Sequence, residues 1–353
     1  MRVTFICLEW PHSGHVGGVG RYAYRLASSL AADPDIELTV VTFEGGTALD
    51  GAALRFLPRP AGRFGRFYGA PLRLRKIVAS TRPDVIHSFG DDWALATHAG
   101  VPLVRTFLGS SLSEARSSTG LRRLNHYVLA LTEQLSAQRA DHKIGIGPDS
   151  FEAFRCEDLM PPVTAIAPRG HARKSNSPSV VFIGSYGGRK RGALVAEVVA
   201  EAQAQLGIEI RLTVVGPESD SASWPAGTVH KSGATDDVVQ EVVETAWVLV
   251  APSLYEGFGI PTFEALSLGT AVIASSNPGS RYMLRATEES GALSVVEDKR
   301  LVPELIARLL HGPNLSSAED VGRRKAVDAL LNAASSIRLT TDIYPRSIAE
   351  AAN

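Results

Sequence analysis

Residues 255–265 of this 353-residue chain read Tyr255-Glu256-Gly257-Phe258-Gly259-Ile260-Pro261-Thr262-Phe263-Glu264-Ala265. The apolar run 247–253 before them predicts a buried strand. Residues 261–268 predict a short helix, because proline stands in the first turn and Gly269 follows the end. The order of strand, glycine loop and helix is typical of parallel α/β folds. Such a loop brings backbone N–H groups, a positive helix end and the acids Glu256 and Glu264 to one place.

This combination of groups fits a sugar nucleotide. A diphosphate binds N–H donors and positive potential, which we expect around Phe258, Gly259, Ile260 and Pro261. Ribose and hexose hydroxyls bind carboxylate acceptors. Glutamate near a helix start also complements the helix dipole, which is the structural alternative for Glu264. However, Glu264 falls too late after Pro261 for an ordinary capping box.

The two acids resemble the E-x7-E signature of retaining glycosyltransferases with the GT-B fold. The likeness is to family 4 in particular, with its mannosyl-, glucosyl- and N-acetylglucosaminyltransferases. Residues 267–276 look like that family's passage from helix to strand. The resemblance implies that Glu264 binds the ribose hydroxyls and that Glu256 contacts the donor sugar.

The chain is longer than a usual domain with a single hydrophobic core, so we expect two domains. Strand-like runs alternate with helical patterns, which indicates a parallel α/β fold, and the proline- and serine-rich stretch 168–178 marks a linker. The resemblance implies the GT-B arrangement of two Rossmann-like domains with parallel sheets facing a central cleft. We expect an acceptor-side domain over residues 1–170, a donor-side domain over 171–330, and a tail of about 330–353 that packs back on the first.

The apolar patterns predict the individual elements. Strands are expected at 3–8, 38–43, 85–87, 101–107, 144–146, 179–184, 210–215, 248–251 and 271–275. Helices are expected at 20–32, 72–80, 121–139, 193–206 and 236–245. Residues 302–310 and 324–336 are the candidates for helices that cross back to the first domain.

A second glycine loop, Gly17-Gly18-Val19-Gly20-Arg21-Tyr22, follows the first expected strand. Glycines let a backbone approach a phosphate closely, but they also serve to pack a helix on a strand. The loop resembles the Gly-Gly-x-Gly-Arg-Tyr loop of family 4 mannosyltransferase-like enzymes. This implies donor-site roles for Gly18 and Gly20 and an acceptor-side role for Arg21. His12 and His15 flank the loop as further acceptor- or sugar-side candidates, and solvated loop histidines are the alternative.

The second half begins with a basic loop, Gly184-Ser185-Tyr186-Gly187-Gly188-Arg189-Lys190-Arg191-Gly192. Three cations between a strand and a helix suit a diphosphate that gains charge during transfer, so Arg189, Lys190 and Arg191 join Glu256 as catalytic candidates. Gly184 is expected to line the donor site. A solvated basic turn is the alternative. Family members carry arginine directly after this glycine and lysine before the later one, where this chain has Ser185 and Arg191. Arg189 or Lys190 is expected to substitute.

A further departure from the family concerns Leu108, which follows the expected strand 101–107. The corresponding family strand commonly ends in a histidine that faces the transferred sugar. Leucine makes no hydrogen bond, so that contact is lost or moved. His87, at the end of an earlier strand, matches another family histidine, and a buried structural role is the equal alternative.

Composition limits the other classes of function. The formal net charge of −1 argues against general nucleic-acid binding. Cys7 and Cys156, the two cysteines, suggest neither a disulfide framework nor a zinc site. No apolar segment approaches the roughly 18 residues that span a bilayer, and residues 1–8 read as a buried strand rather than a signal peptide. We expect a cytoplasmic protein, and the alanine- and arginine-rich composition suggests a bacterial source.

The stretch 55–143 is basic, with fourteen Lys and Arg against six Asp and Glu. It interleaves cations with apolar residues at 63–68 and 73–76. Such segments fit an anionic or lipid-linked acceptor or peripheral membrane contact, and a solvated basic surface is the alternative.

The leading hypothesis is transfer of a hexose from a nucleotide-diphosphate sugar to an acceptor hydroxyl, with retention at the anomeric carbon. No metal or other cofactor is required where cations and helix ends stabilise the leaving diphosphate. GDP, UDP and dTDP remain open as the donor nucleotide, and a glycan, lipid-linked or small-molecule acceptor is open as well. The alternatives are a non-catalytic GT-B protein that binds a nucleotide sugar or supports a partner enzyme, and a sugar-nucleotide epimerase of similar fold.

Overall fold

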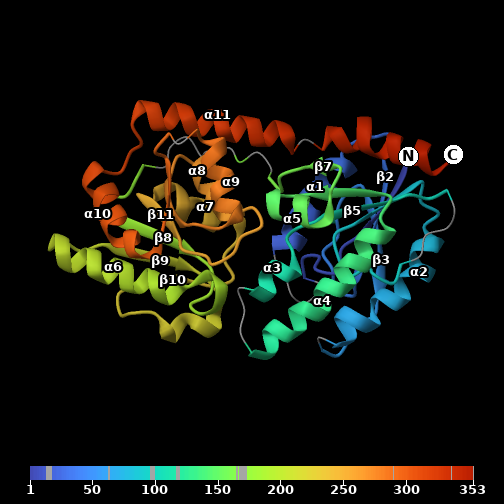
Figure 1. The fold of residues 1–353 in the computed structure, drawn as a ribbon, viewed down its shortest axis with the longest axis horizontal. Coiled ribbons are helices and arrows are strands. Elements are labelled where there is room, and N and C mark those ends of the chain that lie inside the picture. The colour runs from blue at the N-terminus through green and yellow to red at the C-terminus, as the bar shows by residue number, and fades with distance from the viewer. Residues whose placement is uncertain are drawn as a thin grey trace. The chain divides into compact units, whose positions relative to one another are not determined.

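A computed structural model describes the chain except residues 13–17, 63, 96–99, 117–119, 164, 165, 167–172, 289, 335 and 353, and it describes only the backbone of Arg122. The chain divides into two compact units, shown in Figure 1. Unit 1 comprises Met1–Thr164 and Ala333–Asn353, and unit 2 comprises Ala165–Asn332. The expected boundary near residue 170 stays a prediction, because it lies outside the described residues.

Unit 1 is built on a seven-stranded sheet in the order β3-β2-β1-β4-β5-β6-β7, and every pairing is parallel. Its strands are β1 (Arg2–Ile6), β2 (Glu37–Phe43), β3 (Ala52–Leu57), β4 (Val85–Ser88), β5 (Leu103–Phe107), β6 (His142–Gly145) and β7 (Asp158–Leu159). The order reverses between β1 and β4, as it does in Rossmann folds. Loops after these two strands therefore meet at the topological switch point.

Both faces of this sheet are buried. Along the first strand, Val3 and Phe5 face one core with α1 (Gly18–Ala31), while Ile6 faces a second core with α2 (Pro71–Ser80). This alternation is the period of two expected of a strand. The remaining helices of the unit are η1 (Gly65–Gly69), α3 (Ser111–Arg116), α4 (Gly120–Arg139), α5 (Pro148–Phe154), η5 (Leu339–Ile343) and α12 (Tyr344–Ala351).

Unit 2 repeats the plan with a parallel six-stranded sheet in the order β10-β9-β8-β11-β12-β13. Its strands are β8 (Ser179–Ile183), β9 (Arg211–Val215), β10 (Val229–Lys231), β11 (Val248–Ala251), β12 (Ala271–Ser275) and β13 (Leu293–Val296). Its helices are η2 (Gly188–Lys190), α6 (Gly192–Leu206), η3 (Glu218–Ser223), α7 (Asp236–Thr245), α8 (Ile260–Ser267), α9 (Pro278–Ala286), η4 (Asp298–Arg300), α10 (Leu301–His311) and α11 (Ser317–Ala333). Here the order reverses between β8 and β11.

The end of the chain differs in part from the expectation. Residues 302–310 form α10, whose Leu301, Leu305 and Leu309 are buried beside α6 in the core of unit 2, so this helix does not cross to unit 1. The segment after Ala333 does belong to unit 1, where Leu339, Ile343 and Tyr344 are fully buried in the first core. Figure 1 shows both ends of the chain on this unit.

Candidate functional site

The acidic loop of unit 2 runs from β11 to α8. Gly259 caps the helix with a left-handed backbone (φ 95°), a conformation that favours glycine. In the described part of the chain, the backbone N–H groups of Gly257, Phe258 and Ile260 donate no hydrogen bond. Pro261, grouped with them in the sequence prediction, has no N–H and cannot donate. The loop therefore offers a short row of donors at a helix start, where anions bind.

The start of α9 fixes this loop from behind. Gly279 N–H donates to the Glu256 carbonyl at 3.0 Å, and a side chain at Gly279 would meet the Phe258 carbonyl oxygen at 2.5 Å. The Asn277 amide donates to the Ser253 carbonyl at 3.1 Å. The close approach needs glycine, and it holds the donors of the loop in place.

Two cations of the basic loop converge on one acid. Lys190 Nζ lies 2.6 Å from Glu256 Oε1, and Arg189 Nη1 lies 3.2 Å from the same oxygen. Arg189 also donates to the Tyr255 carbonyl at 2.8 Å. Burial by itself would raise the pKa of Glu256, but Lys190 and Arg189 outweigh it, and the pKa lies below the ordinary value. Glu256 is thus an ionised carboxylate beside the loop that follows β8.

Gly184 lets Lys190 lie across the end of β8. Its backbone φ is 154°, and a side chain there would stand 2.9 Å from Lys190 Cβ. Arg191 is bound differently from its neighbours. Its guanidinium donates to the Pro252 carbonyl at 2.6 Å, to Ser275 Oγ at 2.9 Å, and to both oxygens of Asp298 at 2.6 and 2.7 Å. These contacts favour Arg189 and Lys190 as phosphate ligands, and such a role for Arg191 stays a prediction.

Glu264 lies on α8, one turn beyond the loop, and its side chain is partly exposed. Phe263 and Ala265 on either side of it are buried. The helix therefore presents Glu264 outward on the element that begins with the free N–H groups. Its predicted contact with ribose hydroxyls stays a prediction.

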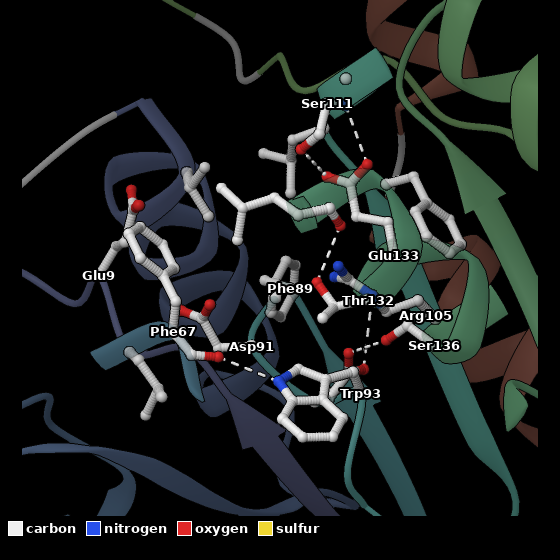
Figure 2. Close-up of a pocket in the computed structure, with 18 of the residues that line it drawn as sticks. Glu9, Phe67, Phe89, Asp91, Trp93, Arg105, Ser111, Thr132, Glu133 and Ser136 are labelled. Atoms are coloured by element: carbon white, nitrogen blue, oxygen red, sulfur yellow. Dashed lines mark hydrogen bonds and ion pairs between the residues drawn. The ribbon is translucent and has the colours of Figure 1, made fainter. Parts of the chain in front are cut away.

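Unit 1 holds a second pocket, of about 210 Å³, at its own switch point. Figure 2 shows the loops after β1, β4 and β5 and one side of α4 around it. The aromatic rings of Phe67, Phe89 and Trp93 form part of the wall. Leu108 lines the same pocket and packs partly against the core.

The polar groups of this pocket come from several elements. Glu133 on α4 accepts hydrogen bonds from the Ser111 backbone N–H at 2.9 Å and from its hydroxyl at 2.7 Å. Asp92 accepts from Ser136, and Arg105 Nε lies 3.4 Å from Asp92 Oδ2. Burial raises the pKa of Glu133, although its bonds to Ser111 act in the opposite direction.

Two family models cover most of the chain. Residues 16–168 match Glycosyltransferase Family 4, and residues 164–328 match Glycosyl transferases group 1. The chain is a family 4-like glycosyltransferase with the GT-B fold. The expected family, fold class and kind of enzyme are thereby confirmed.

Relatives of this glycosyltransferase include a phosphatidyl-myo-inositol mannosyltransferase of Mycolicibacterium smegmatis, 27% identical over 84% of this chain and 82% of that protein. An MMP alpha-(1->4)-mannosyltransferase of Mycolicibacterium hassiacum is 30% identical, but the match covers only 45% of this chain and 39% of that protein. Sucrose-phosphate synthase from Thermosynechococcus elongatus has the same fold, with a TM-score of 0.81 at 19% identity over 99% of this chain and 100% of that one.

The family-like glycine loop of this glycosyltransferase begins α1 at Gly18. A side chain at Gly20 would stand 1.8 Å from the Glu9 carbonyl oxygen, so glycine is required there to pack the helix on the first loop. Arg21 is exposed. His12 contacts the Thr47 hydroxyl through Nδ1, and His15 lies outside the described residues. Phosphate or acceptor binding by this loop stays a prediction.

His87 lies in the core of unit 1 with no exposed surface. Its ring nitrogens contact the Tyr344 and Thr106 hydroxyls, both at 2.7 Å, and its ring stacks on Phe89 with centroids 4.5 Å apart. Burial, together with Arg105 and His142, lowers the pKa of His87 to about 3. Of the two alternatives that the sequence left open, the structure favours the buried structural histidine.

Sequence reasoning missed most of the polar groups in the unit 1 pocket. Glu9 and the pair Asp91-Asp92 come shortly after the ends of buried strands, and acids at that position are a readable signal for a switch-point site. Arg105 interrupts a strand whose five residues are all buried, which is a second signal. Glu133 stands within an ordinary helical pattern and offers no local signal.

Two absences concern only the residues that the structure describes. No three His, Cys, Asp or Glu side chains in this part of the chain are grouped to hold a metal ion. Among the helices that the structure describes, none combines the length and apolar character needed to cross a bilayer.

Proposed function

We propose that this glycosyltransferase moves a hexose from a nucleotide-diphosphate sugar to an acceptor hydroxyl with retention of configuration. The observation that carries the proposal is the convergence of Lys190 and Arg189 on Glu256, beside a loop with free N–H donors. One acid, two cations and a helix start at one switch point match the chemistry of a sugar diphosphate.

Glu256 and the cations exchange partners when the donor binds. Glu256 neutralises Lys190 and Arg189 in the structure, and the diphosphate attracts both cations away from this carboxylate. Glu256 then accepts a hydrogen bond from a hydroxyl of the hexose. Because its pKa is held low, Glu256 is an acceptor and not a proton donor at neutral pH.

Transfer builds negative charge on the leaving diphosphate. Lys190, Arg189 and the N–H groups of the acidic loop would stabilise that charge, so the reaction needs no metal or other cofactor. Glu264 would hold the ribose hydroxyls. The acceptor hydroxyl would lose its proton to the leaving phosphate on the same face of the sugar, which gives retention.

The first test separates donor binding from transfer. Lys190→Met should weaken binding of UDP, GDP or dTDP, whichever the wild type prefers, by about 10- to 100-fold, because a charge-assisted bond to phosphate is lost. Glu256→Gln should preserve or tighten nucleotide binding, because the cations are no longer neutralised, and should lower turnover by at least about 100-fold. Glu264→Ala should weaken nucleotide binding by about 10-fold. Calorimetry and a transfer assay measure the two effects.

The matched control is Lys299→Met, which removes an exposed lysine of unit 2 whose side chain is 79% accessible. It should change neither quantity. Equal loss of nucleotide binding in Lys190→Met and Lys299→Met would refute the phosphate assignment. A product with inverted anomeric configuration, read by NMR, would refute retention alone.

We further propose a cytoplasmic enzyme that contacts an anionic membrane surface through unit 1. Along α4, Leu121, Leu124, Val128, Leu131 and Leu135 are exposed at heptad spacing. A different face of the same helix, with Thr132, Glu133 and Ser136, lines the pocket. A surface helix usually has the reverse polarity. Cations lie at both ends of α4, and the stretch 55–143 is basic. These positive charges favour contact with anionic lipid rather than with a positively charged partner.

A further inference from the structure

We infer that the pocket of unit 1 binds an acceptor that carries an ammonium group, an amino-polyol, and that Asp91 is the anchor of that ammonium. The inference rests on the proposed function, because it takes this pocket as the acceptor site.

The lining of the pocket is predominantly acidic. Five carboxylates line the pocket, those of Glu9, Asp91, Asp92, Glu114 and Glu133. Arg105 is the one Lys or Arg among the described lining residues, and it lies against Asp92. A phosphorylated acceptor would bring a second set of negative charges into this lining, whereas an ammonium would complement it.

Four of these acids already have partners. Glu9 pairs with Arg66 at 2.5 Å, and Glu114 lies 3.5 Å from His126 Nε2. Asp92 is bound by Ser136 and Arg105, and Glu133 is bound twice by Ser111. These contacts hold their carboxylates in the protein framework.

Asp91 differs from the other four. In the described part of the chain, no hydrogen bond or ion pair reaches its carboxylate, and the side chain is half-buried in the pocket lining. Burial raises the pKa of Asp91 to about 7, and Glu9 and Asp92 add to the effect while Arg66 and Arg105 oppose it. Partial removal of a carboxylate from water without a partner costs free energy, and a bound cation offsets that cost.

The backbone at Asp91 supports the same conclusion. Its φ is 57°, in the left-handed region that an aspartate seldom adopts, and it follows Gly90 with φ 152°. Residues held in that region are frequent at ligand sites. Here the conformation sets the carboxylate in the lining that Figure 2 shows, near the rings of Phe67 and Trp93.

The walls define the rest of the ligand. Phe67, Phe89 and Trp93 present apolar surfaces, and the Trp93 indole N–H is bound by the Phe67 carbonyl at 3.0 Å, which fixes the ring. Ring C–H faces of a polyol pack against such surfaces, and an ammonium is further favoured by aromatic faces. Leu108 contributes another apolar wall, which offers no hydrogen bond to a ligand.

The experiment compares three soluble cyclitol probes on the full-length protein. Calorimetry at about pH 8, where Asp91 is ionised, should give binding of scyllo-inosamine at least about 10-fold tighter than that of myo-inositol. myo-Inositol 1-phosphate should bind more weakly than both. Asp91→Asn keeps the shape of the side chain and should abolish the preference for the amine. The matched control Glu152→Gln removes an exposed acid of the same unit and should leave the preference intact.

Wild-type affinity for the amine should also fall below about pH 7, as Asp91 takes up a proton, while affinity for myo-inositol stays level. Nucleotide binding, measured on the same samples, reports on unit 2 separately. A wild-type protein that binds no nucleotide would refute the donor proposal. The comparison of the three probes would still test the acceptor inference.

Two results would overturn the inference. One is binding of myo-inositol 1-phosphate as tight as that of the amine. The other is an unchanged amine preference in Asp91→Asn. A dodecyl glucosaminide, tested against free glucosamine, distinguishes a lipid-linked source of the ammonium from a soluble one.

Discussion

His87 shows how a single residue ties the core of unit 1 together. It contacts hydroxyl groups from β5 and α12, on elements far apart in the sequence. Both of its ring nitrogens are engaged, so one donates and one accepts while the ring stays neutral. The sequence placed this histidine at the end of a strand, but its partner Tyr344 is 257 residues away, and no local pattern predicts that contact.

The neutral state of His87 has a consequence for stability. Its folded pKa of about 3 lies below the ordinary 6.5, so between these values the unfolded chain binds a proton that the folded chain does not. Folding stability should therefore fall as the pH drops below about 6.5, by about 2 kcal/mol at pH 5 from this residue.

The measurement is hydrogen exchange of the β4 amides of wild type and His87→Gln from about pH 7 to pH 5, corrected for intrinsic rates. The slope of folding stability against pH should be smaller in His87→Gln than in the wild type. His311→Gln, at an exposed histidine, should keep the wild-type slope. Parallel slopes in wild type and His87→Gln would show that the histidine is not the group responsible.

At the scale of elements, strands buried on both faces were predictable and edge strands were not. Val248–Ala251 and Ala271–Ser275 are continuous apolar runs, and the structure has them with the predicted bounds. Ala52–Leu57 escaped prediction because it is an edge strand with an exposed Arg55 and Phe56, and three-residue β10 carries His230 and Lys231. Side chains that face solvent on an edge lose the apolar signal.

The exposed stripe of α4 leads to a prediction at the same scale. Leu124 and Leu131 are 62% and 67% exposed, so Leu124→Ser with Leu131→Ser should leave the fold intact. Co-sedimentation with vesicles of phosphatidylglycerol and phosphatidylcholine should fall by about 10-fold or more. Two leucines that become buried in the bilayer contribute a few kcal/mol to membrane binding.

Leu310→Ser, at a 72% exposed leucine of unit 2, is the control and should sediment like the wild type. Binding should also weaken with added salt. Vesicle binding that is unchanged by the two α4 substitutions would refute the proposed membrane contact. A change in oligomeric state instead would assign the stripe to contact between two copies of the chain.

At the scale of the whole molecule, the repeat of one strand order explains why two pockets exist. Both units contain the strand order 3-2-1-4-5-6, which β7 extends in unit 1, and each has a pocket where that order reverses. The sequence predicted the donor-side loops, because Glu256, Lys190 and their glycines lie in two short segments. It did not predict the pocket of unit 1, because Glu9, Asp91, Arg105 and Glu133 come from four separate segments that only the fold assembles.

The last segment of the chain completes unit 1 rather than unit 2. Leu339, Ile343 and Tyr344 have no exposed surface, and Arg338 and Arg346 pair with Asp158 at 2.6 and 2.9 Å. Removing residues 334–353 should therefore unfold unit 1, because each large buried side chain contributes about 2–5 kcal/mol, more in sum than a domain can spare. Calorimetry should show loss of the unit 1 transition. Asp158→Asn, which weakens these two pairs and the 2.9 Å contact of Asp158 with His142, should cost about 1 kcal/mol or less for each arginine pair. A truncated chain that keeps both transitions would show that the tail is dispensable.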